Sequence, residues 1–103
     1  MALNEAIRNA SVTIGTSAVD VCPPVDFGVV KVRTFTNTST GGQVITLTWG
    51  QGNPTALSGI VLYPAGSCSE SIDNAFVPSN VRVMGIASAA GATLAVHERV
   101  SYG

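Results

Sequence analysis

The chain has 103 residues, which is the length of a single domain. Charged residues make up 11% of it, less than half the usual fraction of about 25%, while 46% are hydrophobic, so the chain does not have the composition of a disordered protein. The net charge is −1 and the five basic residues are scattered, so nucleic-acid binding by phosphate neutralisation is not expected. A surface with so few charges favours association with other surfaces; a monomer covered in uncharged polar groups is the alternative.

The first ten residues differ in pattern from the rest of the chain. Leu3, Ala6, Ile7 and Ala10 recur at helical spacing, but two turns are too few for a stable isolated helix. This stretch also lacks the apolar core of a secretory signal, and the chain has no run of 18 apolar residues, so we expect neither a cleaved leader nor a membrane span. We interpret residues 1–10 as an arm, either a docked helical turn or an extended segment lying on a neighbouring subunit.

From Ser11 onward, β-branched residues alternate with polar ones and are interrupted by Gly, Pro, Asn and Ser, which is the pattern of short strands. About eight strands are expected, at residues 11–14, 18–22, 29–37, 43–49, 57–63, 68–72, 81–87 and 92–100. This spacing is typical of a sandwich or barrel, and no strand is followed by a long helical segment. The sequence therefore predicts one domain over residues 11–103, an all-β, antiparallel, jelly-roll-like sandwich.

The clearest predicted strand is 29–37, which carries apolar groups on both faces and is therefore expected to be central. Residues 37–42 (NTSTGG) tolerate the backbone conformations of turns, and 43–49 follow directly, so a β-hairpin between 29–37 and 43–49 is expected. The predicted core residues are Val12, Ile14, Val19, Val30, Val32, Phe35, Ile45, Leu47, Ile60, Leu62, Ile72, Val81, Val83, Ile86, Leu94 and Val96.

Candidate catalytic groups are few. His97 is the single histidine, and strand alternation puts it on the opposite face from Glu98, which argues against a His–Glu dyad. The Ser-rich run 66–69 (GSCS) lacks the G-x-S-x-G pattern of a nucleophile elbow. The acids near turns and strand ends have the simpler interpretation of solvated carboxylates; they are Asp20, Asp26, Glu70 and Asp73. We therefore expect no enzymatic activity.

Metal and cofactor sites are not expected either. Asp20 and Asp26 bracket Pro23-Pro24 and could form only a weak calcium site, because the EF-hand spacing is absent. The glycine-rich turns lack the lysine of a phosphate-binding loop. Cys22 and Cys68 fit no zinc or redox motif; both lie at predicted strand ends, so either a disulfide or two free thiols is open, and a reducing cytoplasm favours free thiols.

The aromatic residues could form a platform for sugars, but aromatic side chains are also common core and interface anchors. We predict contacts with other subunits through a set of apolar, aromatic and basic residues: Leu3, Ile7, Arg8, Trp49, Tyr63, Phe76 and Tyr102.

Four segments resemble, in order, small β-domains of tailed-bacteriophage virion proteins: 11–21 (SVTIGTSAVDV), 33–39 (RTFTNTS), 59–67 (GIVLYPAGS) and 81–96 (VRVMGIASAAGATLAV). The resemblance implies a non-enzymatic virion structural protein, a cement or decoration protein that binds the major capsid protein or another virion protein. It further implies a homo-oligomer, with a trimer favoured, that is assembled in the host cytoplasm and located in the virion. The alternative is a receptor- or carbohydrate-binding β-module of a tail fibre or spike.

Overall fold

A computed structural model describes residues 5–50, 54–55, 57–71 and 79–102. The described residues form eight strands and no helix, and so no helix of the length and hydrophobicity needed to cross a bilayer. The strands are β1 (Glu5–Ile14), β2 (Val19–Cys22), β3 (Val29–Asn37), β4 (Ile45–Trp49), β5 (Ile60–Leu62), β6 (Ser67–Ser71), β7 (Val83–Ala87) and β8 (Ala92–Ser101).

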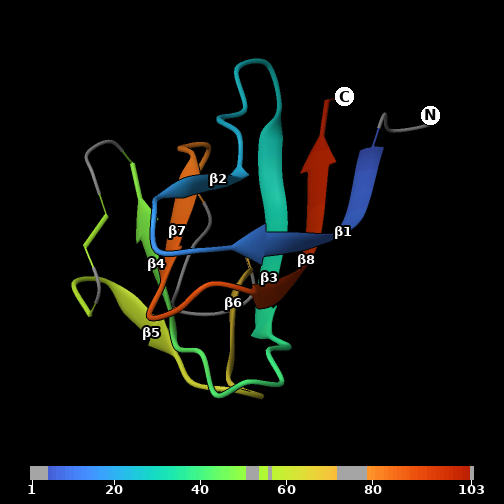
Figure 1. Ribbon diagram of the computed structural model, residues 1–103. Coiled ribbons are helices and arrows are strands. Elements are labelled where there is room, and N and C mark those ends of the chain that lie inside the picture. Colours follow the sequence, from blue (N-terminus) through green and yellow to red (C-terminus); the bar gives the residue numbers. More distant parts are fainter. Residues whose placement is uncertain (1–4, 51–53, 56, 72–78, 103) are drawn as a thin grey trace.

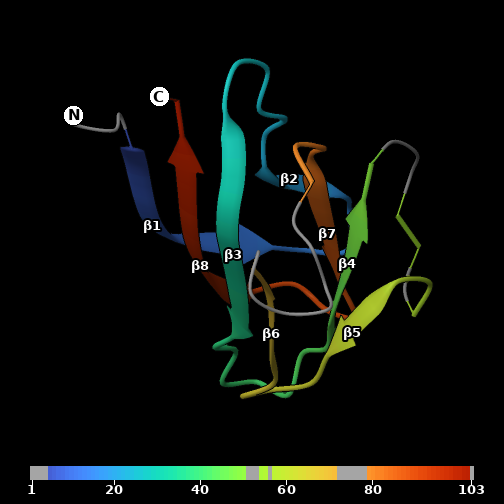
Figure 2. The same ribbon diagram turned by 180° about the vertical axis from the view of Figure 1, so that it is seen from behind.

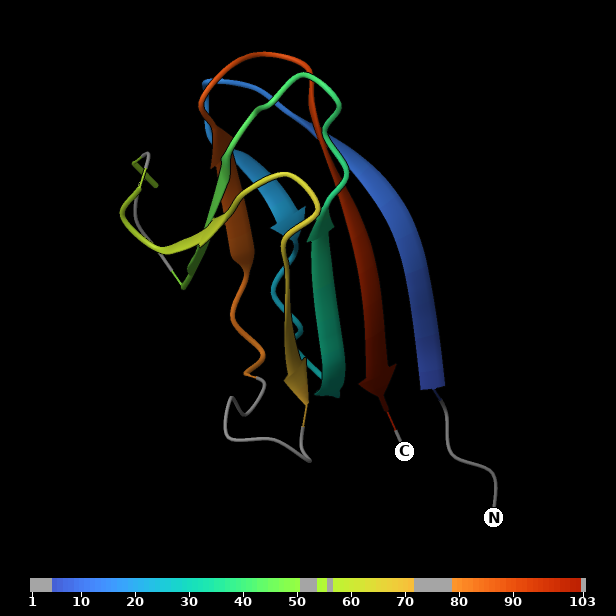
Figure 3. The ribbon, with the colours of Figure 1, turned by 90° about the horizontal axis from the view of Figure 1, so that it is seen from below.

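The strands form two four-stranded antiparallel sheets (Figure 1). We call the sheet with the order β1-β8-β3-β6 the long sheet and the sheet with the order β2-β7-β4-β5 the short sheet. Figure 3 shows the strands of the long sheet side by side in one layer, opposite those of the short sheet. Eight antiparallel strands in two packed sheets are the jelly-roll architecture, which confirms the predicted fold class.

The first described residues are extended, not helical. Residues 5–10 continue without a break into 11–14, and β1 pairs with β8 over its whole length, from Glu5 opposite Ser101 to Ile14 opposite Ala92. A two-turn helix would leave many of its backbone groups unpaired, whereas the ladder with β8 satisfies them cooperatively. Residues 5–10 of the predicted arm are therefore part of the sandwich, and residues 1–4 lie outside the described residues.

The predicted hairpin between 29–37 and 43–49 is wrong. β3 is indeed a central strand, but it pairs with β8 and β6 of the long sheet, while β4 pairs with β5 and β7 of the short sheet. In this arrangement the apolar inner faces of both strands are buried between the sheets, as Phe35 of β3 and Leu47 of β4 illustrate. A flat hairpin would place the two strands in one layer and could not bury them against each other.

The core lies between the two sheets and contains nine of the predicted core residues: Ile14, Val30, Phe35, Ile45, Leu47, Leu62, Val83, Leu94 and Val96. Val12, Val19 and Ile60 pack against it half-buried, and Ile72 lies outside the described residues. Three predictions were wrong: Val32 and Ile86 are only half-buried, and Val81 is 40% exposed. A register shift between Val30 and Val32 explains the first error, because it puts Val30 on the inner face with Arg33 and leaves Val32 half-buried.

Candidate interaction surface at the open end of the sandwich

One end of the sandwich is incompletely closed because the sheets differ in strand length. β1 and β8 have ten residues each, whereas β2 has four and β7 has five. We define the open end as the end at which Glu5 of β1, Ser101 of β8 and Val29 of β3 lie in register. Figures 1 and 2 show the marked chain ends and the β2–β3 connection, residues 23–28, at this end. Here the inner face of the long sheet faces a connection instead of a strand.

A row of alternating charges crosses the inner face of the long sheet. Strand register places Arg8 of β1 opposite Glu98 of β8, Glu98 opposite Arg33 of β3, and Arg33 opposite Glu70 of β6. The ion pairs follow this register: Arg8 Nη1 lies 3.7 Å from Glu98 Oε1, Arg33 Nε lies 2.7 Å from Glu98 Oε2, and Arg33 Nη1 lies 3.9 Å from Glu70 Oε1. Every strand of this sheet therefore contributes one charged side chain to the row.

Arg33 is fully buried and connects the row to the chain segments that cover the open end. Its Nη1 donates to the carbonyl oxygens of Ser79, at 3.2 Å, and Val81, at 2.7 Å, and its Nη2 donates to that of Pro23 at 3.5 Å. Arg8 makes a similar link, since its Nη2 donates to the carbonyl oxygen of Val21 in β2 at 3.1 Å. The two guanidinium groups thus join the long sheet to backbone opposite it.

Glu70, at the end of the row, is buried and only one of its two carboxylate oxygens is hydrogen-bonded to a described residue. Trp49 Nε1, from the short sheet, donates to Glu70 Oε2 at 3.0 Å, but Glu70 Oε1 accepts no hydrogen bond from the described residues. Burial raises the pKa of the Glu70 carboxyl above its usual value of 4.5, an effect that the Trp49 hydrogen bond and the Arg33 charge only partly offset. The ionised carboxylate therefore carries a desolvation cost in the folded state.

The raised pKa predicts how Glu70 couples stability to pH. The folded protein binds this proton more tightly than the unfolded chain, so Glu70 favours folding below pH 4.5, and this contribution is lost as the pH rises through the native pKa. We compare the free energies of unfolding of Glu70→Gln and of the unsubstituted protein. As the pH rises through that window, the unsubstituted protein loses the contribution of Glu70 and the variant does not, so the value for the variant should rise relative to that of the unsubstituted protein. Urea denaturation at a series of pH values measures this difference, and a difference that falls with pH would contradict the assignment. Asp20→Asn, at an exposed position of β2, reports the effect of removing one negative charge alone.

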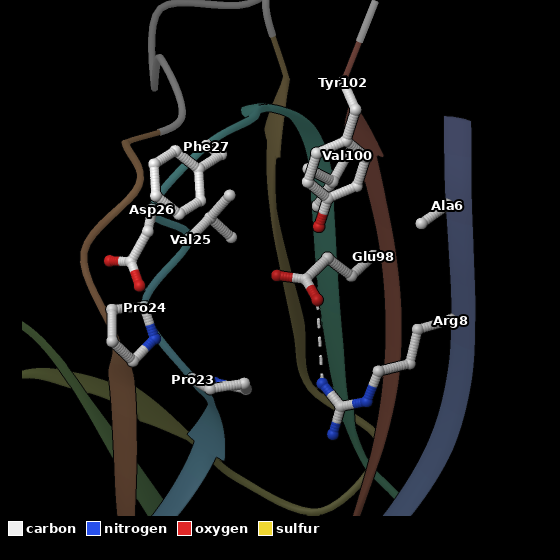
Figure 4. A pocket seen from close by; sticks show the side chains of 10 residues that line it. All are labelled: Ala6, Arg8, Pro23, Pro24, Val25, Asp26, Phe27, Glu98, Val100 and Tyr102. Carbon is white, nitrogen blue, oxygen red and sulfur yellow. Dashed lines mark ion pairs between the residues drawn. The ribbon is translucent and has the colours of Figure 1, made fainter. Parts of the chain in front are cut away.

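A slot opens beside the charge row, between the β2–β3 connection and the strands β1 and β8 (Figure 4). Its cavity volume is about 330 Å³. Pro23, Pro24, Val25, Asp26 and Phe27 form one wall, Ala6, Val100 and Tyr102 form the other, and Arg8 and Glu98 lie at the base. The slot therefore combines mostly apolar walls with a base whose charges are already paired.

The β2–β3 connection is held in place by two residues. The side chain of Asn80 donates from Nδ2 to the carbonyl oxygen of Gly28 at 2.6 Å and accepts at Oδ1 from the amide of Val30 at 3.1 Å. The backbone carbonyl oxygen of Asn80 accepts from the amide of Val25 at 2.9 Å. Gly28 packs so closely on β8 that a Cβ there would lie 2.7 Å from Val100 Cγ1. The wall of the slot is thus fixed before any partner binds.

Two large and strongly exposed side chains, Phe27 and Tyr102, line the slot. Among the described residues, seven large apolar side chains are strongly exposed, and five of these lie at the open end. Besides Phe27 and Tyr102 they are Val81, which lies beside Pro24, and Ile7 and Val29, which strand alternation places on the outer face of the long sheet. Phe27 is the extreme case, with 92% of its surface exposed. A cluster of this kind is typical of an interaction surface, whereas single exposed apolar residues are common on any protein.

The structure separates the predicted contact residues. Ile7, Arg8 and Tyr102 all lie at the open end, but on two faces: Arg8 and Tyr102 line the slot, whereas Ile7 lies on the outer face of the long sheet. Tyr63 is exposed but follows β5, far along the chain from the slot, and Trp49 packs edge-on against Phe35 at a centroid distance of 5.7 Å. Leu3 and Phe76 lie outside the described residues.

Sequence reasoning missed the charge row and the prominence of Phe27. A signal for the row was present, because Arg33 precedes the apolar Phe35 by two residues and Glu98 lies between Val96 and Val100 at the same spacing, so that these charges share a face with core residues. Phe27 follows Pro-Pro-Val-Asp in a predicted connection, where a large apolar residue has no strand partner to bury it.

The candidate catalytic and metal-binding residues are dispersed. His97 lies on the outer face of the long sheet, with Nδ1 2.6 Å from Asn9 Oδ1 and Nε2 accepting from Arg99 Nε at 3.1 Å, while Glu98 faces inward. Asp20 and Asp26 are exposed, and Asp73 lies outside the described residues. Within the described ranges no three His, Cys, Asp or Glu side chains lie close enough together to hold a metal ion.

Both cysteines are free thiols. Cys22, at the end of β2, is buried and accepts a hydrogen bond from Arg8 Nη1 at 3.7 Å, while Cys68 of β6 is half-buried against the core. Burial raises the pKa of each thiol to about 11. The thiolate is the reactive form, so neither side chain is prepared for nucleophilic or redox chemistry at neutral pH.

Comparisons with known proteins show a likeness in fold. No family model and no curated protein matches the sequence. A solved chain from Bacillus endospore appendages, which are described as a novel family of disulfide-linked pili, is similar with a TM-score of 0.64 and 18% identity over 97% of this chain and 87% of that one. The two chains share a fold. None of these findings supports the resemblance to phage virion proteins.

Proposed function

We propose that this chain is a non-enzymatic structural subunit that assembles with copies of itself. The observation that carries the proposal is the set of exposed apolar side chains at the open end, above all Phe27 and Tyr102, which line the slot. The fold likeness to a pilus protein supports it, because that chain also belongs to an assembly. The edge of β1 offers a second contact, since β1 pairs with β8 alone and leaves backbone groups of a ten-residue strand free of partners among the described strands.

We also propose two forms that the assembly could take, a virion component or a filament. The sequence motifs favour a virion component that is built in the host cytoplasm and binds a capsid protein as a trimer, whereas the fold likeness favours a filament such as a pilus. Both are made of structural subunits, and the mass of the assembly distinguishes them. The carbohydrate-binding alternative has less support, because Trp49 is engaged with Phe35 and Glu70 and is not free to form an exposed platform.

Replacing Phe27 by Asp tests the proposal. Burying a phenylalanine contributes about 1.5–3 kcal/mol, so its loss should weaken self-association roughly tenfold to a hundredfold. Sedimentation equilibrium or light scattering over a range of concentrations measures the change. Leu57→Asp is the matched control, because it replaces another strongly exposed apolar residue, 67% exposed, away from the open end. An unsubstituted protein that stays monomeric up to about 1 mM would contradict the proposal.

A further inference from the structure

Exposed aromatic groups lie at opposite ends of β3. The slot lies beside the start of this strand at Val29, and the turn formed by residues 63–66 (YPAG) lies beside its end at Asn37, because the amide of Ala65 donates to the carbonyl oxygen of Asn37 at 2.8 Å. Figure 1 shows the β5–β6 connection at the bottom of the sandwich, away from the chain ends. Tyr63, at the start of this turn, is 63% exposed.

The turn is a preformed projection. The amide of Gly66 donates to the carbonyl oxygen of Tyr63 at 2.7 Å, and the carbonyl oxygen of Gly66 accepts from the amide of Asn37 at 2.9 Å. Asn37 is fully buried, and its Nδ2 donates to the carbonyl oxygen of Leu62 at 2.8 Å, which fixes the residue before Tyr63. A group held in this way loses little conformational entropy on binding.

The slot and the turn match in size and charge. A volume of about 330 Å³ is at the lower limit of ligand pockets and suits one aromatic side chain. The charges at the base of the slot, Arg8 and Glu98, are paired with each other, so an ionic ligand would have to compete with that pair. Residues 63–66 carry no charge, and the tyrosine ring has an apolar body for the walls of the slot and a hydroxyl group for its base.

We infer that the slot of one copy receives Tyr63 and its turn from a second copy, so that subunits join head to tail. This inference rests on the proposed self-assembly and specifies its geometry. Two different patches then meet at each contact, which makes the contact heterologous: repeated, it closes into a ring or continues as a filament. A subunit changed at one end still has the other end for binding.

The test uses one variant for each end. Tyr63→Asp changes the projection, and Ala6→Trp fills the slot from an exposed position on β1. Each variant alone should associate at least tenfold more weakly than the unsubstituted protein, while Leu57→Asp should not. An equimolar mixture of the two variants should form dimers and nothing larger, because only one functional slot and one functional projection remain to meet. Circular dichroism and thermal unfolding check that each variant folds.

The results distinguish failure of self-assembly from failure of the head-to-tail contact. If the unsubstituted protein is monomeric, self-assembly and the head-to-tail contact both fail. If it assembles and both variants assemble equally well, the head-to-tail contact fails while the proposed function stands. If Ala6→Trp blocks assembly, Tyr63→Asp does not, and the mixture yields no defined dimer, the open ends meet each other and the inference is overturned.

Discussion

Replacing Arg33 by Leu is expected to lower the free energy of unfolding by about 3–5 kcal/mol, the usual cost of removing one partner from a buried ion pair. The substitution leaves Glu98 and Glu70 without their shared cation and deprives the carbonyl oxygens of Ser79 and Val81 of their donor. This loss is a large part of the 5–15 kcal/mol of a typical domain. Urea denaturation followed by tryptophan fluorescence measures it, since Trp49 is the single tryptophan.

Two further variants separate charge pairing from packing. Lys31→Leu removes a cation from the same strand at a half-buried position that forms no ion pair with another described residue, and should change stability by less than about 0.5 kcal/mol. The triple variant Arg33→Leu, Glu70→Leu, Glu98→Leu should regain much of the loss, because an apolar replacement of a whole buried ion network is often neutral or stabilising. A single Arg33→Leu change without effect would mean that the row is not closed off from water.

Asn37→Leu is expected to cost about 2–4 kcal/mol, since each unsatisfied buried polar group costs about 1–3 kcal/mol. Asn37 Nδ2 donates to the carbonyl oxygen of Gln43 at 2.9 Å and to the carbonyl oxygen of Leu62 at 2.8 Å, and both oxygens lose this donor in the variant. The matched control is Asn9→Leu, an asparagine in a strand whose side chain contacts His97 on the exposed face, where we expect less than about 0.5 kcal/mol. Thermal and urea denaturation compare the two, and equal losses would show that Asn37 has no special role.

The strands could be predicted from the sequence, whereas most of their partners could not. Alternation and turn residues are local signals, and they placed β3 at 29–37, where the structure has it. Pairing depends on which faces must be buried against each other, and this information is spread over the whole chain. The economical hairpin between adjacent segments was wrong for that reason, and the register shift near Lys31 could not be inferred from alternation either.

The candidate surface could be predicted only in part. Ile7, Arg8 and Tyr102 were expected at contacts, and the structure brings them to one end because β1 and β8 are neighbours. The charge row needed the register of three strand pairs, which no single segment contains. Phe27 needed knowledge of the unequal sheet lengths, because the β2–β3 connection that carries it takes the place of a strand at the open end and leaves the side chain exposed.

The position of β8 has a consequence for how the molecule forms. The last of the eight strands lies between β1 and β3, so the first strand has no partner until the last has been made. Contacts this distant in sequence slow folding, and a nascent chain still on the ribosome would expose the inner faces of β1 and β3. Folding of this sheet therefore waits for β8, and subunits become competent to associate only after synthesis has passed Ser101.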